Sequence, residues 1–171
     1  RLSGLAIGSA SSLADVNTRV AHMSAHCTSR QLYKFALPEV SRGSFRGLVY
    51  VAPGAKGTDA EQNCRNLLAD PGARMHTEPQ LEIYCDDVKA SHGAATGQLS
   101  AEALFYMRQR GIPEAEARNM LMQAFMADVV DTFTMDGLQD RLRHLVEKRL
   151  SGAGPEACAN CSASCIPPPS A

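Results

Sequence analysis

The sequence has no tryptophan, and aromatic residues make up only 5% of its 171 residues. It also lacks an apolar run near the roughly 20 residues that a membrane-spanning helix needs. Its formal net charge is −1, so it has no strong positive field to attract nucleic acid or an anionic membrane. These absences predict a globular cytoplasmic protein that binds neither nucleic acid nor membranes.

The common catalytic motifs are missing as well. The segment GAKGTD at 54–59 lacks the G-x₄-G-K-[ST] pattern, so we expect this chain to bind no nucleotide. Glu82, Asp86 and Asp87 could serve glycoside chemistry, which uses paired carboxylates. Neighbouring side chains of a strand point to opposite faces, however, and this favours a charged turn that ends a strand. A polysaccharide-active enzyme remains an alternative.

Residues 1–92 are predicted to form short strands separated by turns rich in Gly, Pro, Asn, Asp and Ser. Such a pattern is typical of a sandwich, a barrel or a solenoid, and with no visible repeat of fixed length the periodicity does not choose among them. The segment 58–68, TDAEQNCRNLL, is expected to be a helical turn or an irregular coil. The strand candidates are 5–7, 18–22, 31–37, 45–51 and 80–85.

After Leu99 the apolar period becomes that of a helix. Ser100 is a good N-cap, and Gly111 suits the left-handed turn that ends a helix. Pro113 favours the start of a second helix, and a third is predicted to begin near Asp136. One apolar stripe is expected on the second helix, formed by Ala117, Met120, Leu121, Ala124 and Phe125.

Six cysteines divide into two groups. With no secretory signal a disulfide framework is not expected, and Cys27, Cys64 and Cys85 are interpreted as small buried apolar residues. Cys158, Cys161 and Cys165 form C-x₂-C-x₃-C in a tail rich in Gly, Pro, Ala and Ser. These thiolates suit zinc or iron but are one ligand short of a full set. A metal-handling tail and an inert flexible end both remain open.

Three segments resemble one known family: AHCTSRQLYKFAL at 25–37, RGSFRGLVYVAPGAKGTDAEQNCRNLLAD at 42–70, and TEPQLEIYCDDVKASHGAATGQLSAEALFYMRQRGI at 77–112. They are similar to the SufB/SufD family, the scaffold proteins of the SUF iron–sulfur cluster assembly system, and the likeness is closer to SufD. The resemblance covers about residues 17–150. Family members are longer, so we expect a C-terminal portion of such a protein.

The resemblance implies a right-handed parallel β-helix over residues 1–95 and a small helical domain over 96–151, followed by a flexible tail over 152–171. It implies a non-catalytic scaffold subunit that pairs with a SufB-like scaffold through the β-helix, or with itself when alone. A SufC-like ABC-type ATPase is expected to bind the helices. Candidate residues for that contact are Leu104, Phe105, Met122, Phe125 and Met126.

His92, in the segment KASHGA, is expected in a polar turn between the strands and the first helix. Imidazole suits iron, and the resemblance implies a role for this histidine with a transient iron–sulfur cluster or iron at the partner interface. The family commonly has cysteine where this chain has Ala90, so that thiolate is missing. Cys85, Cys158, Cys161 and Cys165 are auxiliary ligand candidates. A histidine that only bonds to a turn, within a purely structural adaptor, is the remaining alternative.

Overall fold

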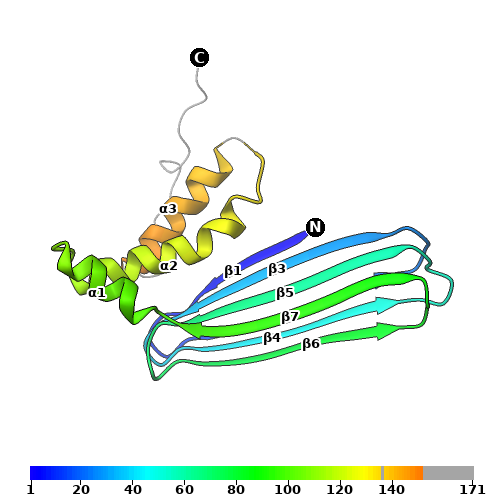
Figure 1. Ribbon diagram of the computed structural model, residues 1–171, viewed down its shortest axis with the longest axis horizontal. Helices are drawn as coiled ribbons and strands as arrows, with labels where there is room; N and C mark the ends of the chain where they lie inside the picture. The colour runs from blue at the N-terminus through cyan, green and yellow to red at the C-terminus, as the bar shows by residue number, and fades with distance from the viewer. Residues whose placement is uncertain (136, 152–171) are drawn as a thin grey trace, which may run out of the picture.

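The computed structural model describes residues 1–135 and 137–151, and it consists of a stack of strands followed by helices (Figure 1). Seven strands occur in this described part of the chain. They are β1 (Leu2–Ile7), β2 (Leu13–His22), β3 (Thr28–Leu37), β4 (Arg42–Val51), β5 (Thr58–Leu68), β6 (Arg74–Ile83) and β7 (Val88–Gln98).

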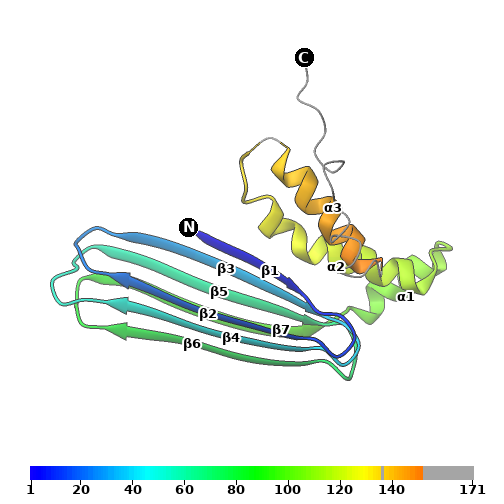
Figure 2. The same cartoon turned by 180° about the vertical axis from the view of Figure 1, so that it is seen from behind.

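Successive strands alternate between two sheets, so that each pair of strands forms one coil of a parallel β-helix. One sheet has the order β1-β3-β5-β7 and the other the order β2-β4-β6, and neighbouring strands within each sheet are parallel. Figure 2 shows the second sheet from its own side. This arrangement of about three turns confirms the parallel β-helix and excludes an antiparallel sandwich. Its right-handed sense stays a prediction.

Side chains alternate between the interior of the coils and the outside, as the two-residue period of a strand requires. In β4 the interior residues Phe45, Val49 and Val51 are fully buried. In β5 half of the interior residues are polar, namely Thr58, Gln62 and Asn66, and all three are buried. The interior of the β-helix is therefore partly polar, with consequences for both folding and function.

Two sequence predictions about the strands were wrong. The segment 58–68 is neither a helical turn nor an irregular coil but the fully paired strand β5. The strand β7 continues to Gln98, so His92 lies inside a strand rather than in a turn. In both cases the backbone hydrogen bonds that form the strand come from pairing with a neighbouring coil, and the local sequence does not indicate that pairing.

Three helices follow β7: α1 (Ala101–Gln109), α2 (Glu114–Val130) and α3 (Leu138–Leu150). The hydroxyl of Ser100 accepts a hydrogen bond from the N–H of Ala103, which confirms the predicted N-cap. Gly111 has φ +83°, a conformation that glycine adopts without strain, and Pro113 directly precedes α2. The third helix begins close to its predicted start.

Helix α2 covers the outer face of the first sheet near β1 and β3 (Figure 1). Its buried residues Met122 and Met126 pack with Ala36 and Leu67 of the sheet. The predicted stripe was only partly right, because Met120 is 45% exposed while Val129 and Val130 are buried. Which apolar face a helix buries depends on where the sheet lies, not on helical period alone.

Lys34 fixes α2 to the sheet. Its side chain is 3% exposed, and its Nζ donates to the backbone oxygen of Phe125 and to Oδ2 of Asp128, each at 2.5 Å. The ammonium also lies 4.6 Å from the centre of the Phe125 ring. The hydrogen bond from Lys34 holds the pKa of Asp128 below its usual value.

In the described residues no helix is long and apolar enough to cross a membrane.

Candidate functional site: the open end of the coil stack

The candidate site lies at the last coil, formed by β6 and β7. Each of these strands pairs on one side only within the described chain. The interior-facing side chains of β6 and β7, which we call the open coil end, therefore have a coil beneath them but none above. Ile83 is 42% exposed there, whereas its register partner Val51 in the coil below is fully buried. An apolar interior that ends unpaired is a surface that a partner can cover.

His92 belongs to the open coil end. In β7 the residues Val88 and Ala90 pack on the interior cluster, and Thr96 accepts a hydrogen bond from buried Asn66. His92 lies between them on the same face of a strand with unbroken register, so its side chain starts toward the interior. It is nevertheless exposed, because nothing in the described chain stacks above it. Its imidazole is accessible and anchored on a rigid strand.

Beneath His92 lies a column of polar side chains in register. Gln31 of β3 stands beside Gln62 of β5, and Gln62 stands beside His92. Gln62 is fully buried, yet neither its Oε1 nor its Nε2 has a hydrogen-bond partner, and the same holds for Nε2 of Gln31. Gly47 makes room opposite, since a Cβ there would collide with the amide of Gln62. Sequence analysis missed these glutamines; their spacing, one coil apart, was the available signal.

The cysteine candidates do not gather around His92. Cys85 lies in the turn after β6 and packs, half-buried, against the apolar cluster that includes Val49 and Val51. Ala90 faces the interior two residues before His92, where it offers no ligand. In residues 1–135 and 137–151 no group of three or more His, Cys, Asp or Glu side chains is placed to hold a metal. Cys158, Cys161 and Cys165 lie outside the described residues.

The other two body cysteines have different surroundings. Cys64 is fully buried, and burial raises the pKa of its thiol to about 12. Its Sγ donates to Oδ1 of Asn66 at 3.3 Å. A thiol in this state stays protonated and is a poor nucleophile or ligand. Cys27 is half-buried in the turn before β3. The interpretation as a small buried residue therefore holds fully for Cys64 only.

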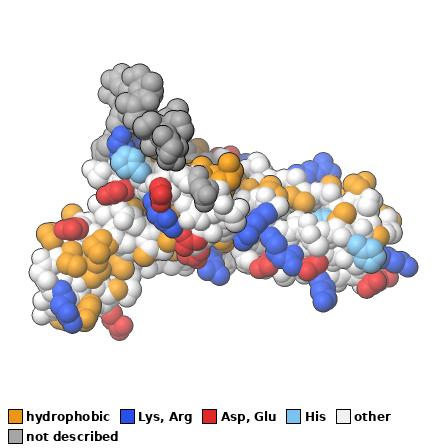
Figure 3. Space-filling view, turned by 90° about the horizontal axis from the view of Figure 1, so that it is seen from above, with side chains coloured by type: hydrophobic (Ala, Val, Ile, Leu, Met, Phe, Trp, Pro, Cys, Tyr) orange, Lys and Arg blue, Asp and Glu red, His pale blue; other side chains and the backbone are white. Residues whose placement is uncertain are grey.

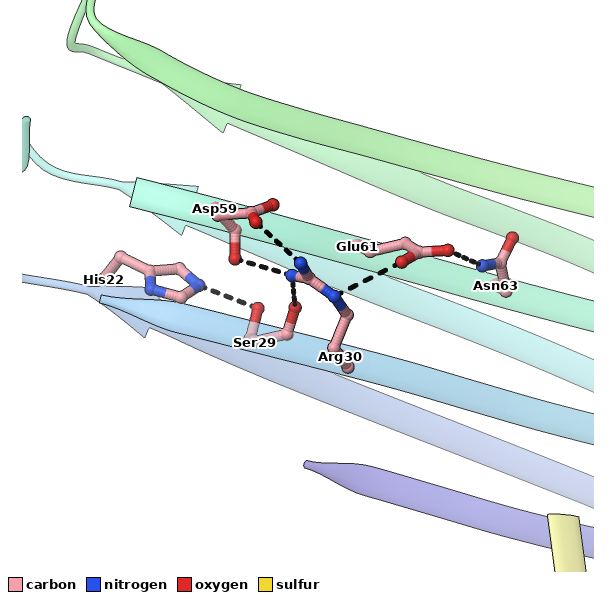
Figure 4. A network of polar contacts seen from close by, with 6 residues as sticks. All are labelled: His22, Ser29, Arg30, Asp59, Glu61 and Asn63. Carbon is pink, nitrogen blue, oxygen red and sulfur yellow. Dashed lines mark hydrogen bonds and ion pairs between the residues drawn. The ribbon is translucent and has the colours of Figure 1, made fainter. Parts of the chain in front are cut away.

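A charged network crosses the outer face of the first sheet, whereas the side chains of the open coil end face the interior (Figure 4). Arg30 of β3 binds Asp59 at 2.6 Å and Glu61 at 3.4 Å, both on β5. The hydrogen bond and charge of Arg30 lower the pKa of Asp59. These side chains are roughly half exposed, and exposed ion pairs of this kind contribute little stability. We interpret the network as surface ion pairs that link two neighbouring coils, not as a functional site.

The same view shows a buried contact beside this network, which Arg30 joins through the backbone oxygen of Ser29. Nε2 of His22 lies 2.9 Å from Oγ of Ser29 (Figure 4). His22 is 4% exposed, and burial lowers the pKa of its imidazole. A buried neutral histidine with a hydroxyl partner is typical of a satisfied core residue.

The residues expected to contact an ATPase differ in exposure. Phe105 is 63% exposed on α1 beside Tyr106, and Leu104 and Phe125 are half-buried. Figure 3 shows hydrophobic side chains gathered at the left end of the molecule, where Figure 1 places α1. Met122 and Met126 of α2 are almost fully buried against the sheet, although each also lines a groove beside α2. The docking role itself stays a prediction.

The carboxylates considered for glycoside chemistry lie at the edge of the last coil. Asp86 and Asp87 are exposed in the turn between β6 and β7, as the charged-turn interpretation predicts. Glu82 lies on β6, one residue before the interior-facing Ile83, so its side chain starts toward the outer face. The backbone oxygen of Asp87 accepts a hydrogen bond from the N–H of Gly57 at 2.7 Å, which ties this turn to the coil below.

The described part of the chain is thus a parallel β-helix that ends in an open coil and is joined to a helical unit, and this architecture defines its structural class. Comparison with known sequences agrees. The family model described as "SUF system FeS cluster assembly, SufBD core domain" matches residues 1–125. The chain belongs to this SufBD family.

Individual relatives support the assignment. The iron–sulfur cluster assembly protein SufD of Escherichia coli is 38% identical over 152 residues, which is 89% of this chain and 36% of that protein. An iron–sulfur cluster assembly SufBD family protein of Synechocystis is 38% identical over 80% of this chain and 30% of its own length. The chloroplastic protein ABCI7 of Arabidopsis thaliana is 39% identical over 70% of this chain and 25% of its own length. The chain thus spans between a quarter and about a third of the length of these relatives, and its likeness is to SufD.

Proposed function

We propose that the chain is the C-terminal part of a SufD-like scaffold subunit, which assembles and transfers iron–sulfur clusters together with SufB-like and SufC-like partners. The cluster is cargo in this proposal, not a resident cofactor. The observation that carries it is the position of His92, which is exposed, ligand-capable and held at the end of a coil stack. The family match over residues 1–125 supplies the chemical context.

The incomplete ligand set favours chemistry at an interface. Iron–sulfur clusters are held mainly by thiolates, with histidine as an alternative ligand. This chain places a single imidazole at the open coil end and no further His or Cys close enough to make a three-ligand group among the described residues. The missing ligands would come from a partner seated on β6 and β7. A SufB-like scaffold, itself expected to be a β-helix, is the partner that could continue the coils.

The open coil end also favours self-association when no such partner is present. The free edges of β6 and β7 offer backbone groups to a second parallel or antiparallel edge. Pro79 interrupts the edge of β6, since it has no N–H, whereas β7 contains no proline. We therefore expect a homodimer through β7 in isolation. Light scattering at increasing concentration tests this, and a strict monomer would contradict it.

The helices are proposed to bind a SufC-like ATPase. Between α2 and α3 the surface has a mainly apolar groove of about 340 Å³, whose lining includes Met120, Ala124 and Met126 and whose polar residues are Gln123, Arg143 and Glu147. Phe105 and Tyr106 expose further apolar surface on α1. Met120→Glu should weaken co-purification with the ATPase, because it puts a charge in the apolar groove. Tyr50, which is half-buried on the β-helix, offers a control position.

The deciding experiment replaces the imidazole in a reconstituted complex. His92→Ala should lower the cluster yield, measured as iron and sulfide per complex under anaerobic conditions, with little change in melting temperature. His76→Ala is the matched control, since His76 is also exposed on the last coil but sits on the outward-facing side of β6. It should leave the yield unchanged.

Full cluster yield in the His92→Ala complex would end the assignment of His92 as a ligand and would favour the purely structural adaptor. Release of reducing ends from a glycan, with no iron or sulfide bound, would favour the polysaccharide-active alternative. A cytoplasmic location is part of the proposal, and it fits the free state of Cys27, Cys64 and Cys85.

A further inference from the structure

Gln62 is the most unusual buried residue of the β-helix. Its side chain is fully buried, both of its polar amide atoms lack a hydrogen-bond partner, and Gly47 leaves the space that the amide occupies, since a Cβ at Gly47 would collide with it. Buried polar groups without hydrogen-bond partners are rare and lower the stability of the fold, so each one needs an explanation. A glutamine kept in this position at such a cost indicates that its amide has a use.

A second amide on the same strand shows what such a use looks like. Asn66, four residues after Gln62 on the same interior face of β5, donates to Oγ1 of Thr96 on β7 at 3.1 Å and to Oγ1 of Thr77 on β6 at 3.0 Å. Its amide nitrogen thereby ties the last coil to the coil below. Gln62 lies on the same interior face of β5, four residues before Asn66. Its register neighbour on β7 is His92, just as Thr96 is the register neighbour of Asn66.

We propose that Gln62 positions His92, a step that rests on the proposed role of His92 as a ligand. The amide Oε1 accepts the N–H of one imidazole nitrogen, which leaves the lone pair of the other nitrogen directed out of the open coil end. Side-chain rotation of the exposed imidazole onto the amide closes this hydrogen bond. Histidines that bind metals usually donate their second ring N–H to such an acceptor, which fixes tautomer and orientation. Gln62 is a positioning residue in this proposal and does not touch the metal.

The test reads the tautomer of His92 directly. Long-range proton–nitrogen NMR spectra of the ¹⁵N-labelled chain distinguish the two neutral tautomers of each histidine. In the unmodified protein His92 should show one dominant tautomer. Gln62→Leu removes the acceptor at nearly constant volume, so it should bring the tautomer mixture toward that of a free histidine. Gln31→Leu is the matched control, because Gln31 is buried in the same column but lies beside Gln62 and not beside His92.

A second readout uses Co²⁺ alone as the probe. Its binding at His92, measured as paramagnetic broadening that His92→Ala abolishes, should weaken roughly tenfold in Gln62→Leu, the lower range for loss of a residue that orients a metal ligand. Gln31→Leu should retain the affinity of the unmodified chain. If Gln62→Leu does not fold, Gln62→Asn keeps an amide that is too short to reach His92, and the same losses are expected from it.

An unchanged tautomer ratio of His92 in the folded Gln62 variant would overturn the proposal. Equal changes in the Gln62 and Gln31 variants would also overturn it, because they would indicate general loosening of the interior. Neither readout involves cluster yield. Failure of the proposed function, seen as full cluster yield in His92→Ala, is therefore distinguishable from failure of the positioning role.

Discussion

The middle and last coils of the β-helix share one interior pattern but differ in what covers it. In the middle coil Phe45, Val49 and Val51 are fully buried between neighbouring coils. In the last coil the equivalent residues of β6 are half-buried or exposed, and Ile83 is 42% exposed. The helices pack mainly on β1 and β3, so they reinforce the early coils more than the last one. Stability thus resides in the middle coil, and the surface available for function lies where stacking stops.

The largest expected loss of stability comes from a substitution inside the middle coil. Phe45→Ala should lower the free energy of unfolding by about 3–5 kcal/mol, because it removes a fully buried ring and leaves a cavity. Ile83→Ala, on the interior face of the last coil, should cost about 1 kcal/mol or less, because much of the side chain is already in water. Urea unfolding of both variants measures the contrast. Similar losses would show that the last coil is as well covered as the middle one.

Two glycine substitutions, one in the middle coil and one in the last coil, test the same difference in interior packing. Gly47→Ala forces a methyl group against the amide of Gln62 and the ring of Phe45, so we expect a loss of about 1–3 kcal/mol. Gly97→Ala in the last coil meets no atom within 4 Å and should be nearly neutral. Melting temperatures of the two variants test this. If Gly47→Ala left the melting temperature unchanged, the side chains around Gln62 would have to be able to move aside for the added methyl group.

A pH series tests the anchor that gives the early coils their helical cover. The pKa of Asp128 is lowered in the folded protein by Lys34, so the unfolded chain takes up the proton first as the pH falls. The stabilisation is therefore complete at neutral pH and is lost below about pH 4, through the lowered pKa. Asp128→Asn should cost about 1.5 kcal/mol at pH 7, the low end for a hydrogen bond to a charged group, because Asp128 is half exposed. The variant should show a smaller acid-induced loss than the unmodified protein; an equal loss would contradict the assignment.

The smallest effect is expected where the last coil passes into α1. Ser100→Ala removes the hydroxyl that caps α1 and should cost about 0.5–1 kcal/mol. Helix α1 has no fully buried residue, so the loss should appear as faster amide hydrogen exchange in residues 101–109 and not in β4. Ser100→Asp keeps a cap and is the control. Faster exchange throughout the β-helix would show that the cap supports more than α1.

The sequence predicted the parts whose signals are local. Ser100, Gly111 and Pro113 marked the ends of the helices because caps and turns depend on a few adjacent residues. Strands such as 31–37 and 45–51 were visible because their interior positions are largely apolar. The strand β5 was missed because Thr58, Gln62 and Asn66 occupy its interior positions, and polar residues there give no apolar alternation.

The coil repeat was invisible for a geometric reason. Leu2 lies beside Gln31, Thr28 beside Asp59, and Thr58 beside Val88, so successive coils are offset by 29, 31 and 30 residues. Turns of different length absorb these differences while the strands stay in register. A search for a repeat of one fixed length therefore finds nothing, although the resemblance to the family still indicated the β-helix.

The sequence by itself determined the family, the change from strands to helices near residue 99 and the presence of one ligand-capable histidine in the segment KASHGA. Only the tertiary structure decided that His92 lies within a strand, on the interior-facing side of an uncovered coil and directly beside Gln62. It also decided that Met122 and Met126 are buried while Met120 is exposed. The reason is that burial and pairing depend on which segments, about 30 residues apart in the chain, are stacked against one another.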